Sequence, residues 1–265
     1  MKSETFAKLT RQLFVVGAQR SGTTYLHKLL SEHPQIEMNE PWWPEPKFFL
    51  QPDAGTRLDE YARIWSAKKN ALVRGEKSVS YMLHPEVAER ISRSFPDASI
   101  IFILRDPVVR AVSNYWYTAN SGLEDKDIDE VLTNESYQNR PYDKTRITGC
   151  PPFDYLKRGK YIDYIESYLN IFDQNQVKIL IHENFVNNRQ EVRALFSFLG
   201  VEPDFAPTSI AETVNAESPK DVQISDRVDN FLRDYYHPSN QKLAARCNVD
   251  LSMWRAPLSS RQVRV

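Results

Sequence analysis

The sequence has few glycines, few cysteines and no long hydrophobic run. Only 8 glycines occur in 265 residues, and two of them, Gly17 and Gly22, lie close together. Cys150 and Cys247 match neither a zinc-ligand spacing nor a CxxC redox pair, so we expect two thiols in a reducing compartment. No stretch approaches the roughly 20 apolar residues that a membrane span needs. Residues 1–12 are polar and mixed in charge, unlike a signal peptide, and the expected location is cytoplasmic.

An excess of charge of either sign is also lacking. The chain carries 34 Lys and Arg against 35 Asp and Glu, a net charge of −1. A global field that would steer the protein onto nucleic acid or an anionic membrane is therefore excluded, although a local basic cleft is allowed. Hydrophobic residues at 41% and charged residues at 26% are typical of a globular protein, and the length predicts a single domain over residues 1–265.

Short apolar runs alternate with helical patterns along the chain. Continuous runs at 13–16, 99–104 and 177–181 predict buried strands of a parallel sheet. The predicted helices cover residues 23–31, 108–117, 161–172, 189–199 and 226–236. This alternation predicts an α/β fold with a mainly parallel sheet. Residues 119–158 lack a clear period and are long for a plain loop, which suggests a lid or substrate-binding insertion.

A glycine loop joins the first predicted strand to the first predicted helix. Gly17 and Gly22 are separated by four residues, and Thr23 and Thr24 follow. Glycines let the backbone wrap around an anion, while the amides and the dipole of the helix N-terminus favour its negative charge. The alternative is a tight turn without a ligand, which the flanking strand and helix make less favourable than a phosphate site.

This loop differs from that of a nucleoside-triphosphate hydrolase. In such loops a lysine follows the second glycine and reaches the β- and γ-phosphates, but Thr23 stands there in this chain. The only cation of the loop is Arg20, and the second predicted strand ends at Arg105 where a magnesium-binding acid would be expected. The loop is therefore expected to hold one terminal anionic group, and no metal is expected.

Two motifs resemble those of sulfotransferases that use 3′-phosphoadenosine 5′-phosphosulfate (PAPS). Gln-Arg-Ser-Gly-Thr-Thr at 19–24 is similar to the family's 5′-phosphosulfate loop. Arg105 after a strand, with Ser113 eight residues later, resembles the pair that binds the 3′-phosphate. A late loop closes over that phosphate in the heparan sulfate branch, and Lys220 stands at the corresponding stretch without the usual glycine. The resemblance implies a P-loop-type sheet flanked by helices, PAPS as donor and 3′-phosphoadenosine 5′-phosphate (PAP) as product. It implies these cofactor-binding residues: Arg20, Ser21, Gly22, Thr23, Thr24, Arg105, Ser113 and Lys220.

Two further segments resemble the heparan sulfate branch of carbohydrate sulfotransferases. Residues 45–49, Glu-Pro-Lys-Phe-Phe, are similar to a Glu-x-x-Phe-Phe segment whose glutamate is the catalytic base. Gly-Glu-Lys-Ser, ending at Ser78, is similar to a segment whose lysine lies near the sulfonate. The resemblance therefore implies Glu45, Arg20 and Lys77 as catalytic residues. The implied reaction is in-line transfer of the sulfonate to an acceptor hydroxyl, with a carbohydrate as the favoured acceptor.

Other residues near these segments leave alternatives open. Glu40, His33 and His84 are rivals for the base, and Glu76 could orient Lys77. Aromatic side chains around Glu45 could stack on sugar rings, although aromatic residues at this density more often form core. The candidate substrate contacts are Glu40, Trp42, Trp43, Phe48 and Glu76.

The sequence leaves several functions open beside carbohydrate sulfation. The acceptor could be a small phenol, an alcohol or a protein tyrosine. A P-loop small-molecule kinase belongs to a different class, and the missing lysine after Gly22 speaks against it. A non-catalytic module that binds PAP or a glycan is the non-enzymatic alternative. The expected partners are PAPS and a hydroxyl-bearing acceptor, which is a glycan or a glycosylated small molecule. Neither a nucleic-acid partner nor a membrane span is expected, and the oligomeric state stays open.

Overall fold

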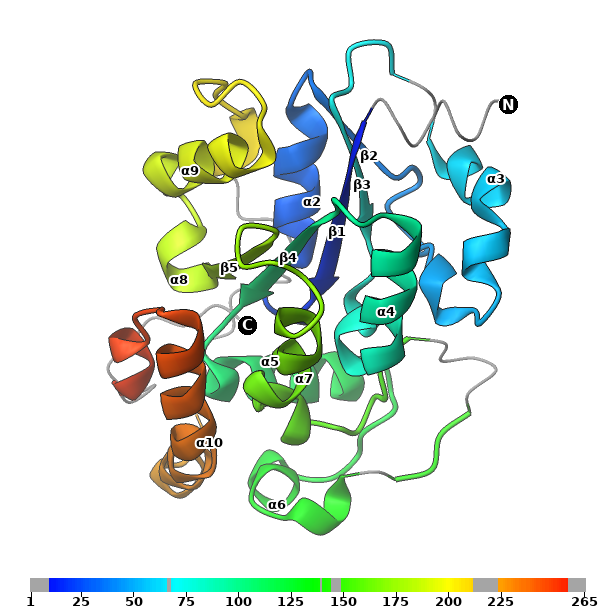
Figure 1. Ribbon diagram of the computed structural model, residues 1–265. Coiled ribbons are helices and arrows are strands. Elements are labelled where there is room, and N and C mark those ends of the chain that lie inside the picture. The colour runs from blue at the N-terminus through cyan, green and yellow to red at the C-terminus, as the bar shows by residue number, and fades with distance from the viewer. Residues whose placement is uncertain (1–9, 66–67, 139, 144–148, 212–223, 257–265) are drawn as a thin grey trace. The chain divides into compact units, whose positions relative to one another are not determined.

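A computed structural model describes residues 10–65, 68–138, 140–143, 149–211 and 224–256 (Figure 1). The contacts within the chain divide it into two compact units. The first unit comprises Met1–Leu104 and Glu166–Asn215, and the second comprises Arg105–Ile165 and Ala216–Val265. Each unit is described by itself, and the single-domain organisation stays a prediction.

The first unit contains a five-stranded sheet in the order β2-β3-β1-β4-β5. Its paired strands are all parallel, which confirms the predicted α/β fold. The strands are β1 Arg11–Gly17, β2 Ile36–Met38, β3 Val73–Lys77, β4 Ser99–Leu104 and β5 Val177–Ile181. The apolar runs correctly predicted β1, β4 and β5, whereas β2 and β3 carry charged residues and gave no such signal.

Helices occur in both units. Those of the first unit are α2 Thr23–Glu32, α3 Leu58–Tyr61, α4 Pro85–Ser94, α8 His182–Phe185 and α9 Arg189–Leu199. Those of the second are α5 Pro107–Asn120, α6 Ile128–Leu132 and α10 Asp226–Cys247, and the boundary between units passes through α7 Ile162–Leu169. Helix α10 continues well beyond its predicted end and includes Pro238. No helix in the described ranges is long and apolar enough to span a membrane.

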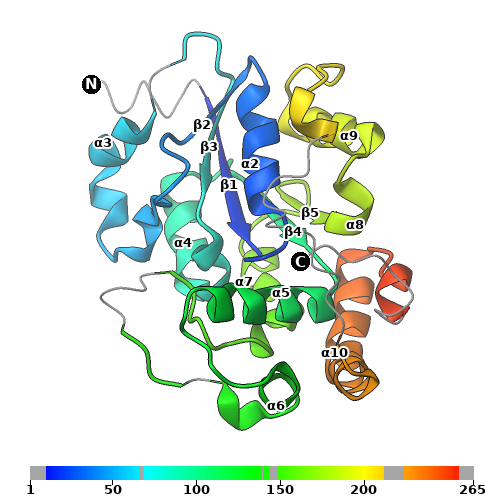
Figure 2. The same cartoon turned by 180° about the vertical axis from the view of Figure 1, so that it is seen from behind.

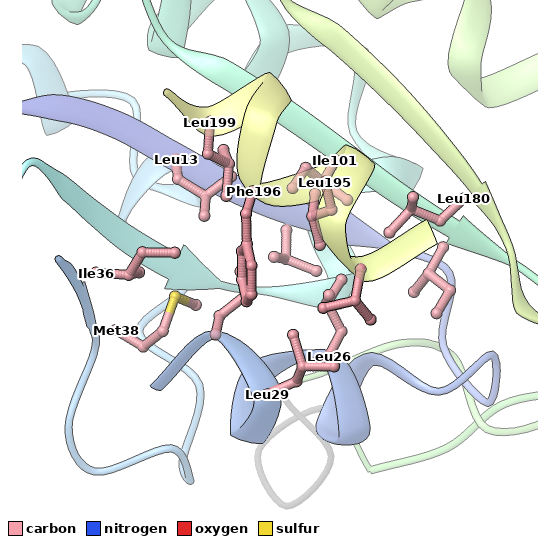
Figure 3. Close-up of a cluster of buried hydrophobic side chains, with 14 of the residues drawn as sticks. Leu13, Leu26, Leu29, Ile36, Met38, Ile101, Leu180, Leu195, Phe196 and Leu199 are labelled. Atoms are coloured by element: carbon pink, nitrogen blue, oxygen red, sulfur yellow. The ribbon is translucent and has the colours of Figure 1, made fainter. Parts of the chain in front are cut away.

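Both faces of β1 are buried, as a continuous apolar run predicts for a parallel strand. Leu13 faces a cluster with Leu26 and Leu29 of α2 and Phe196 of α9 (Figure 3). Phe14 faces the opposite side, where its ring packs against aromatic rings from three other segments. Those rings belong to Phe49, Tyr61 and Phe95.

The register of β3 against β1 separates two charged neighbours. Glu76 pairs with Phe14, and Lys77 pairs with Val15. Successive side chains of a strand point to opposite faces of the sheet. Glu76 therefore points toward the aromatic side, and Lys77 points toward the side covered by α2. Figure 2 shows β1 and β3 next to each other, with both strands ending near the start of α2.

In the second unit, α5 packs with α6 and α10 around an apolar cluster. The Asp106 carboxylate caps α5 by accepting from Val108 N at 3.0 Å. Buried Arg158 donates to Asn114 Oδ1 of α5 at 3.0 Å, and Asn114 Nδ2 donates to Pro152 O at 3.0 Å. The later part of residues 119–158 is thus anchored on α5, and its role as a lid stays a prediction.

Candidate active site

The glycine loop lies between the end of β1 and the start of α2, as predicted. Arg20 and Gly22 have φ angles of 66° and 94°, in the left-handed region. Backbone of this curvature turns successive N–H groups toward one point, which creates an anion-binding concavity. A Cβ atom at position 22 would lie 2.6 Å from His182 Nδ1, so both the φ angle and the space require glycine.

The donor groups of this loop fit an anionic group. Ser21 is completely buried, and its Oγ has no hydrogen-bond partner among the described residues. No side chain caps the N-terminus of α2, whose first residues, Thr23 and Thr24, add hydroxyl donors. A buried hydroxyl beside the N–H groups of a helix start is the donor set that a phosphate or sulfonate takes.

His182 is a loop contact that the sequence analysis missed. It follows β5 directly, and its Nδ1 donates to Ser21 O at 3.0 Å. This contact fixes the loop from the side of β5. The carboxyl ends of parallel strands are where ligands bind in open α/β sheets, so a polar residue directly after a predicted strand was a usable signal.

The structure brings the predicted catalytic residues Glu45 and Lys77 together. Lys77 Nζ lies 2.8 Å from Glu45 Oε1, and both side chains are buried. Glu45 Oε2 accepts from Val79 N at 3.1 Å. The cation and the N–H group both stabilise the ionised carboxylate of Glu45. The ring of Trp42 lies 5.5 Å from Lys77 Nζ, so this pair is bordered by an aromatic face.

Asn39 and His27 form a chain of hydrogen bonds to the backbone of Lys77. Asn39 Oδ1 accepts from Lys77 N at 3.0 Å, and Asn39 O accepts from His27 Nε2 at 3.2 Å. Burial, assisted by the charge of Lys77, lowers the pKa of His27 to about 4. His27 is therefore neutral at pH 7, which avoids a second positive charge beside Lys77.

Glu76 requires a correction to the sequence-based interpretation. Its side chain is completely buried, and its carboxylate accepts from the hydroxyl groups of Tyr61, Ser78 and Tyr81. A buried carboxylate with these partners is not accessible to an acceptor. It also points to the face of the sheet opposite Lys77, so it does not orient that lysine directly.

The rivals for the base have other surroundings. Both ring nitrogens of buried His33 are bonded, to Glu202 O at 2.9 Å and to Gln35 N at 3.1 Å. His84 Nδ1 lies 3.4 Å from a Glu86 carboxylate oxygen. Glu40 is exposed to solvent. Glu45, in contrast to these three residues, forms an ion pair with Lys77.

The aromatic residues near Glu45 divide into two groups. Trp42 and Trp43 are 47% and 58% exposed, whereas Phe49 is fully buried. Phe48 is half-buried and packs on Tyr61, with 4.9 Å between the ring centroids. The tryptophans therefore have faces available to an acceptor, and the phenylalanines serve the packing of the 45–49 segment.

The second unit contains the predicted 3′-phosphate residues in their expected contexts. Arg105 follows β4 directly and is half-exposed, and its carbonyl accepts from Tyr161 OH at 2.7 Å. Ser113 lies buried on α5. Asp106 Oδ2, next to Arg105 in the chain, lies 3.5 Å from Arg233 Nη1. Lys220 lies outside the described residues, and the binding roles of all these residues stay predictions.

A parallel α/β sheet with a glycine loop between β1 and α2 defines a P-loop-type protein, and a buried lysine–carboxylate pair lies at the end of β3. The family model of the sulfotransferase domain matches residues 10–250, and the chain belongs to this family.

Curated relatives and a solved structure agree with this assignment. Human carbohydrate sulfotransferase 15 is 25% identical over 304 residues, covering 91% of this chain and 54% of that protein. Mouse heparan sulfate glucosamine 3-O-sulfotransferase 3B1 is 26% identical, covering 89% of this chain and 63% of that protein. A crystal structure of a sulfotransferase from Alicyclobacillus acidocaldarius is 29% identical with a TM-score of 0.77, covering 93% of this chain and 99% of that chain.

These relatives correct the cytoplasmic prediction. They include the membrane-associated sulfotransferase kil1 of Dictyostelium discoideum, which is 22% identical over 89% of this chain. The chain spans 54% of the length of carbohydrate sulfotransferase 15 and 65% of the length of kil1. Composition and the lack of an apolar run in this sequence therefore do not assign it to the cytoplasm.

Proposed function

We propose that this domain transfers a sulfonate group from PAPS to an acceptor hydroxyl, with Glu45 as the base. The observation that carries the proposal is the buried Lys77–Glu45 pair, 2.8 Å apart. Its lysine ends β3, the strand next to the one that leads into the glycine loop. Membership of the sulfotransferase domain family supports PAPS as the donor.

Each residue has a chemical task in this proposal. Glu45 accepts the proton of the acceptor hydroxyl while that oxygen forms its bond to sulfur. Lys77 holds the Glu45 carboxylate by an ion pair and places a positive charge where the sulfonate is transferred. Arg20, Ser21 and the amides of the loop hold the 5′ end of the donor and stabilise the charge that develops on the leaving phosphate oxygen.

We further propose a carbohydrate as the acceptor. Trp42 and Trp43 are exposed beside the Lys77–Glu45 pair, and flat aromatic faces can stack on sugar rings. The names of the relatives, carbohydrate sulfotransferase 15 and heparan sulfate glucosamine 3-O-sulfotransferase 3B1, point to the same class.

A transfer assay tests this function. Labelled PAPS is offered with a panel of glycans, phenols, alkyl alcohols and tyrosine peptides, with and without EDTA. We expect label on a glycan, and we expect it to persist in EDTA because Arg20 and Lys77 supply the positive charge. Binding of PAP without transfer to any acceptor would favour a binding module, and magnesium-dependent turnover of ATP would restore the kinase interpretation.

Thermal shifts test the donor site independently of the acceptor. PAP is expected to raise the Tm more than AMP does, because a ligand that binds the native state stabilises it. Arg105→Ala should remove most of this difference, since it deletes a charge-assisted contact to the 3′-phosphate. Equal stabilisation by PAP and AMP in the wild type would contradict the roles of Arg105 and Ser113.

A further inference from the structure

Glu76 is a buried acid bound by hydroxyl groups. Its Oε1 accepts from Ser78 Oγ at 2.6 Å and from Tyr81 OH at 2.6 Å, and its Oε2 accepts from Tyr61 OH at 2.8 Å. No Lys or Arg side chain among the described residues forms an ion pair with it. Burial raises its pKa to about 7. A buried acid without a basic partner is costly, so its retention next to the active site calls for a role.

Two of the three hydroxyl groups also hold the segment that carries Glu45. Lys47 N donates to Ser78 Oγ at 2.9 Å, and Phe49 N donates to Tyr81 OH at 2.8 Å. Each hydroxyl has one proton, and it directs that proton to Glu76 while its oxygen accepts the backbone N–H. The result is two parallel relays from the backbone of residues 47 and 49, through Ser78 and Tyr81, to one carboxylate oxygen.

The chain segment between the two relay residues also bonds to Glu45 directly. Val79 N, which donates to Glu45 Oε2 at 3.1 Å, lies between the relay residues in the chain. We propose that Glu76 is a positioning residue which, through Ser78 and Tyr81, holds Glu45 in place against Lys77. This inference rests on the function proposed above, in which Glu45 is the base.

The relays tolerate a neutral side chain at position 76 but need an oxygen there. If a proton resides on Oε2, that oxygen can donate to Tyr61, and Oε1 still accepts from both relay hydroxyls. Glu76→Gln reproduces this arrangement, with the amide oxygen at the Oε1 position and the amide nitrogen toward Tyr61. Glu76→Leu leaves both relay hydroxyls without an acceptor.

Two tyrosines provide a matched pair of variants. Tyr81→Phe and Tyr61→Phe each remove one phenolic hydroxyl that donates to Glu76. Tyr81 OH also accepts from Phe49 N, whereas Tyr61 OH forms no hydrogen bond with the backbone of residues 45–49, a segment that the structure describes throughout. Comparison of these variants therefore separates the holding of the segment from the general stability of the buried acid.

The experiment measures kcat and KM for sulfonate transfer, the PAP-induced shift in Tm, and hydrogen exchange at the amides of Lys47 and Phe49. Tyr81→Phe and Glu76→Leu should lower kcat by roughly 10²-fold, the effect of a small displacement of a catalytic group. KM for PAPS and the PAP shift should stay unchanged. Tyr61→Phe should keep the wild-type kcat, and Glu76→Gln should restore most of what Glu76→Leu loses.

Exchange distinguishes this inference from the function on which it rests. Faster exchange at Phe49 in Tyr81→Phe, but not in Tyr61→Phe, supports the relay even if the wild type transfers no sulfonate, which would overturn the proposed function alone. Unchanged exchange at both amides in Tyr81→Phe and Glu76→Leu would overturn the relay. Faster exchange together with wild-type kcat would overturn the positioning role.

Discussion

Two buried carboxylates lie on opposite faces of the sheet near the end of β3, and they are stabilised in opposite ways. Glu45 is paired with the Lys77 ammonium group and with a backbone N–H. Glu76 is surrounded by hydroxyl groups. Glu45 therefore has a cationic partner, whereas burial is the dominant influence on Glu76 and raises its pKa to about 7.

This difference separates a reactive acid from a supporting one. A general base must lie within hydrogen-bond reach of the proton that it accepts, and in the proposed function Glu45 has this task. A supporting acid needs only to accept hydrogen bonds, which Glu76 does in either protonation state. The same substitution, glutamate to glutamine, should therefore have very different consequences at the two positions.

The largest expected difference is in catalysis. Glu45→Gln keeps the shape of the side chain but cannot accept the proton, so kcat should fall by roughly 10²–10⁴-fold, the usual contribution of a general base. The PAP-induced shift in Tm should hardly change, because Glu45 is assigned to the acceptor. The measurement is sulfonate transfer from labelled PAPS.

Glu76→Gln is the matched control and should retain most of the activity. A kcat close to wild type in Glu45→Gln would contradict the assignment of Glu45 as the base. A large loss in Glu40→Gln or His84→Ala instead would identify where the base is.

The next effect is on stability and its dependence on pH. The folded-state pKa of Glu76, about 7, is raised above its ordinary value of 4.5, so its contribution is fully present below pH 4.5 and is lost as the pH rises through 7. The full loss is on the order of 3 kcal/mol. Glu76→Gln should abolish this fall in the free energy of unfolding, measured by urea titration from pH 4.5 to 8.

Other groups bear on this measurement. Tyr61 and Tyr81 donate to Glu76, and the pKa values of both tyrosines are raised, so their hydroxyls stay protonated in this range. The charge of Glu45 also contributes to the raised pKa of Glu76. His27 acts in the opposite sense: its pKa of about 4 lies below its ordinary 6.5, so its contribution is lost as the pH falls from 6.5. The difference between wild type and Glu76→Gln cancels the His27 contribution, and a difference that does not vary with pH would refute the prediction.

At pH 8, Glu45→Gln should lower the free energy of unfolding, whereas Glu76→Gln should raise it. It leaves the buried Lys77 ammonium group without a counter-charge, and loss of one partner of a buried ion pair costs about 3 kcal/mol. The same substitution at position 76 removes an unpaired charge and should stabilise the protein above pH 7. Equal changes in the free energy of unfolding at pH 8 would mean that the two environments do not differ as described.

The smallest effect is expected at Glu40. This carboxylate is exposed to solvent, and a surface substitution typically changes stability by less than about 0.5 kcal/mol. Glu40→Gln should also have the mildest effect on kcat among the acidic residues near the site. A loss comparable to that of Glu45→Gln would place Glu40 in the acceptor site.

The sequence predicted those parts of the fold that a local apolar pattern reveals. Strands β1, β4 and β5 were recognisable because each is a continuous apolar run. Strand β3, Val-Arg-Gly-Glu-Lys, is equally buried, but each of its three charged side chains has polar partners that bury it without an apolar pattern. Arg74 pairs with Glu37, Glu76 meets hydroxyl groups and Lys77 meets Glu45. Local periodicity cannot reveal such compensation.

The site was predictable to a similar extent. Motif resemblance selected Glu45 and Lys77, and the structure brings them together. It also assigned Glu76 to the substrate, because adjacent letters in a motif do not show that neighbouring side chains of a strand face opposite sides. The position of His182 directly after a predicted strand was a usable local signal, whereas Asn39 depends on a contact with a segment far away in the chain, which no local pattern indicates.

The central position of β1 has a consequence for how the chain folds. Its partners, β3 and β4, begin at residues 73 and 99, and β4 also pairs with β5, which begins at residue 177. Such non-local pairing requires long loops to close first, which makes folding slow. During synthesis the apolar β1 therefore emerges long before the strands that cover its edges, and the His182–Ser21 contact forms after nearly 160 further residues have followed the loop. The loop after β1 is therefore synthesised early, whereas its contact with His182 forms late.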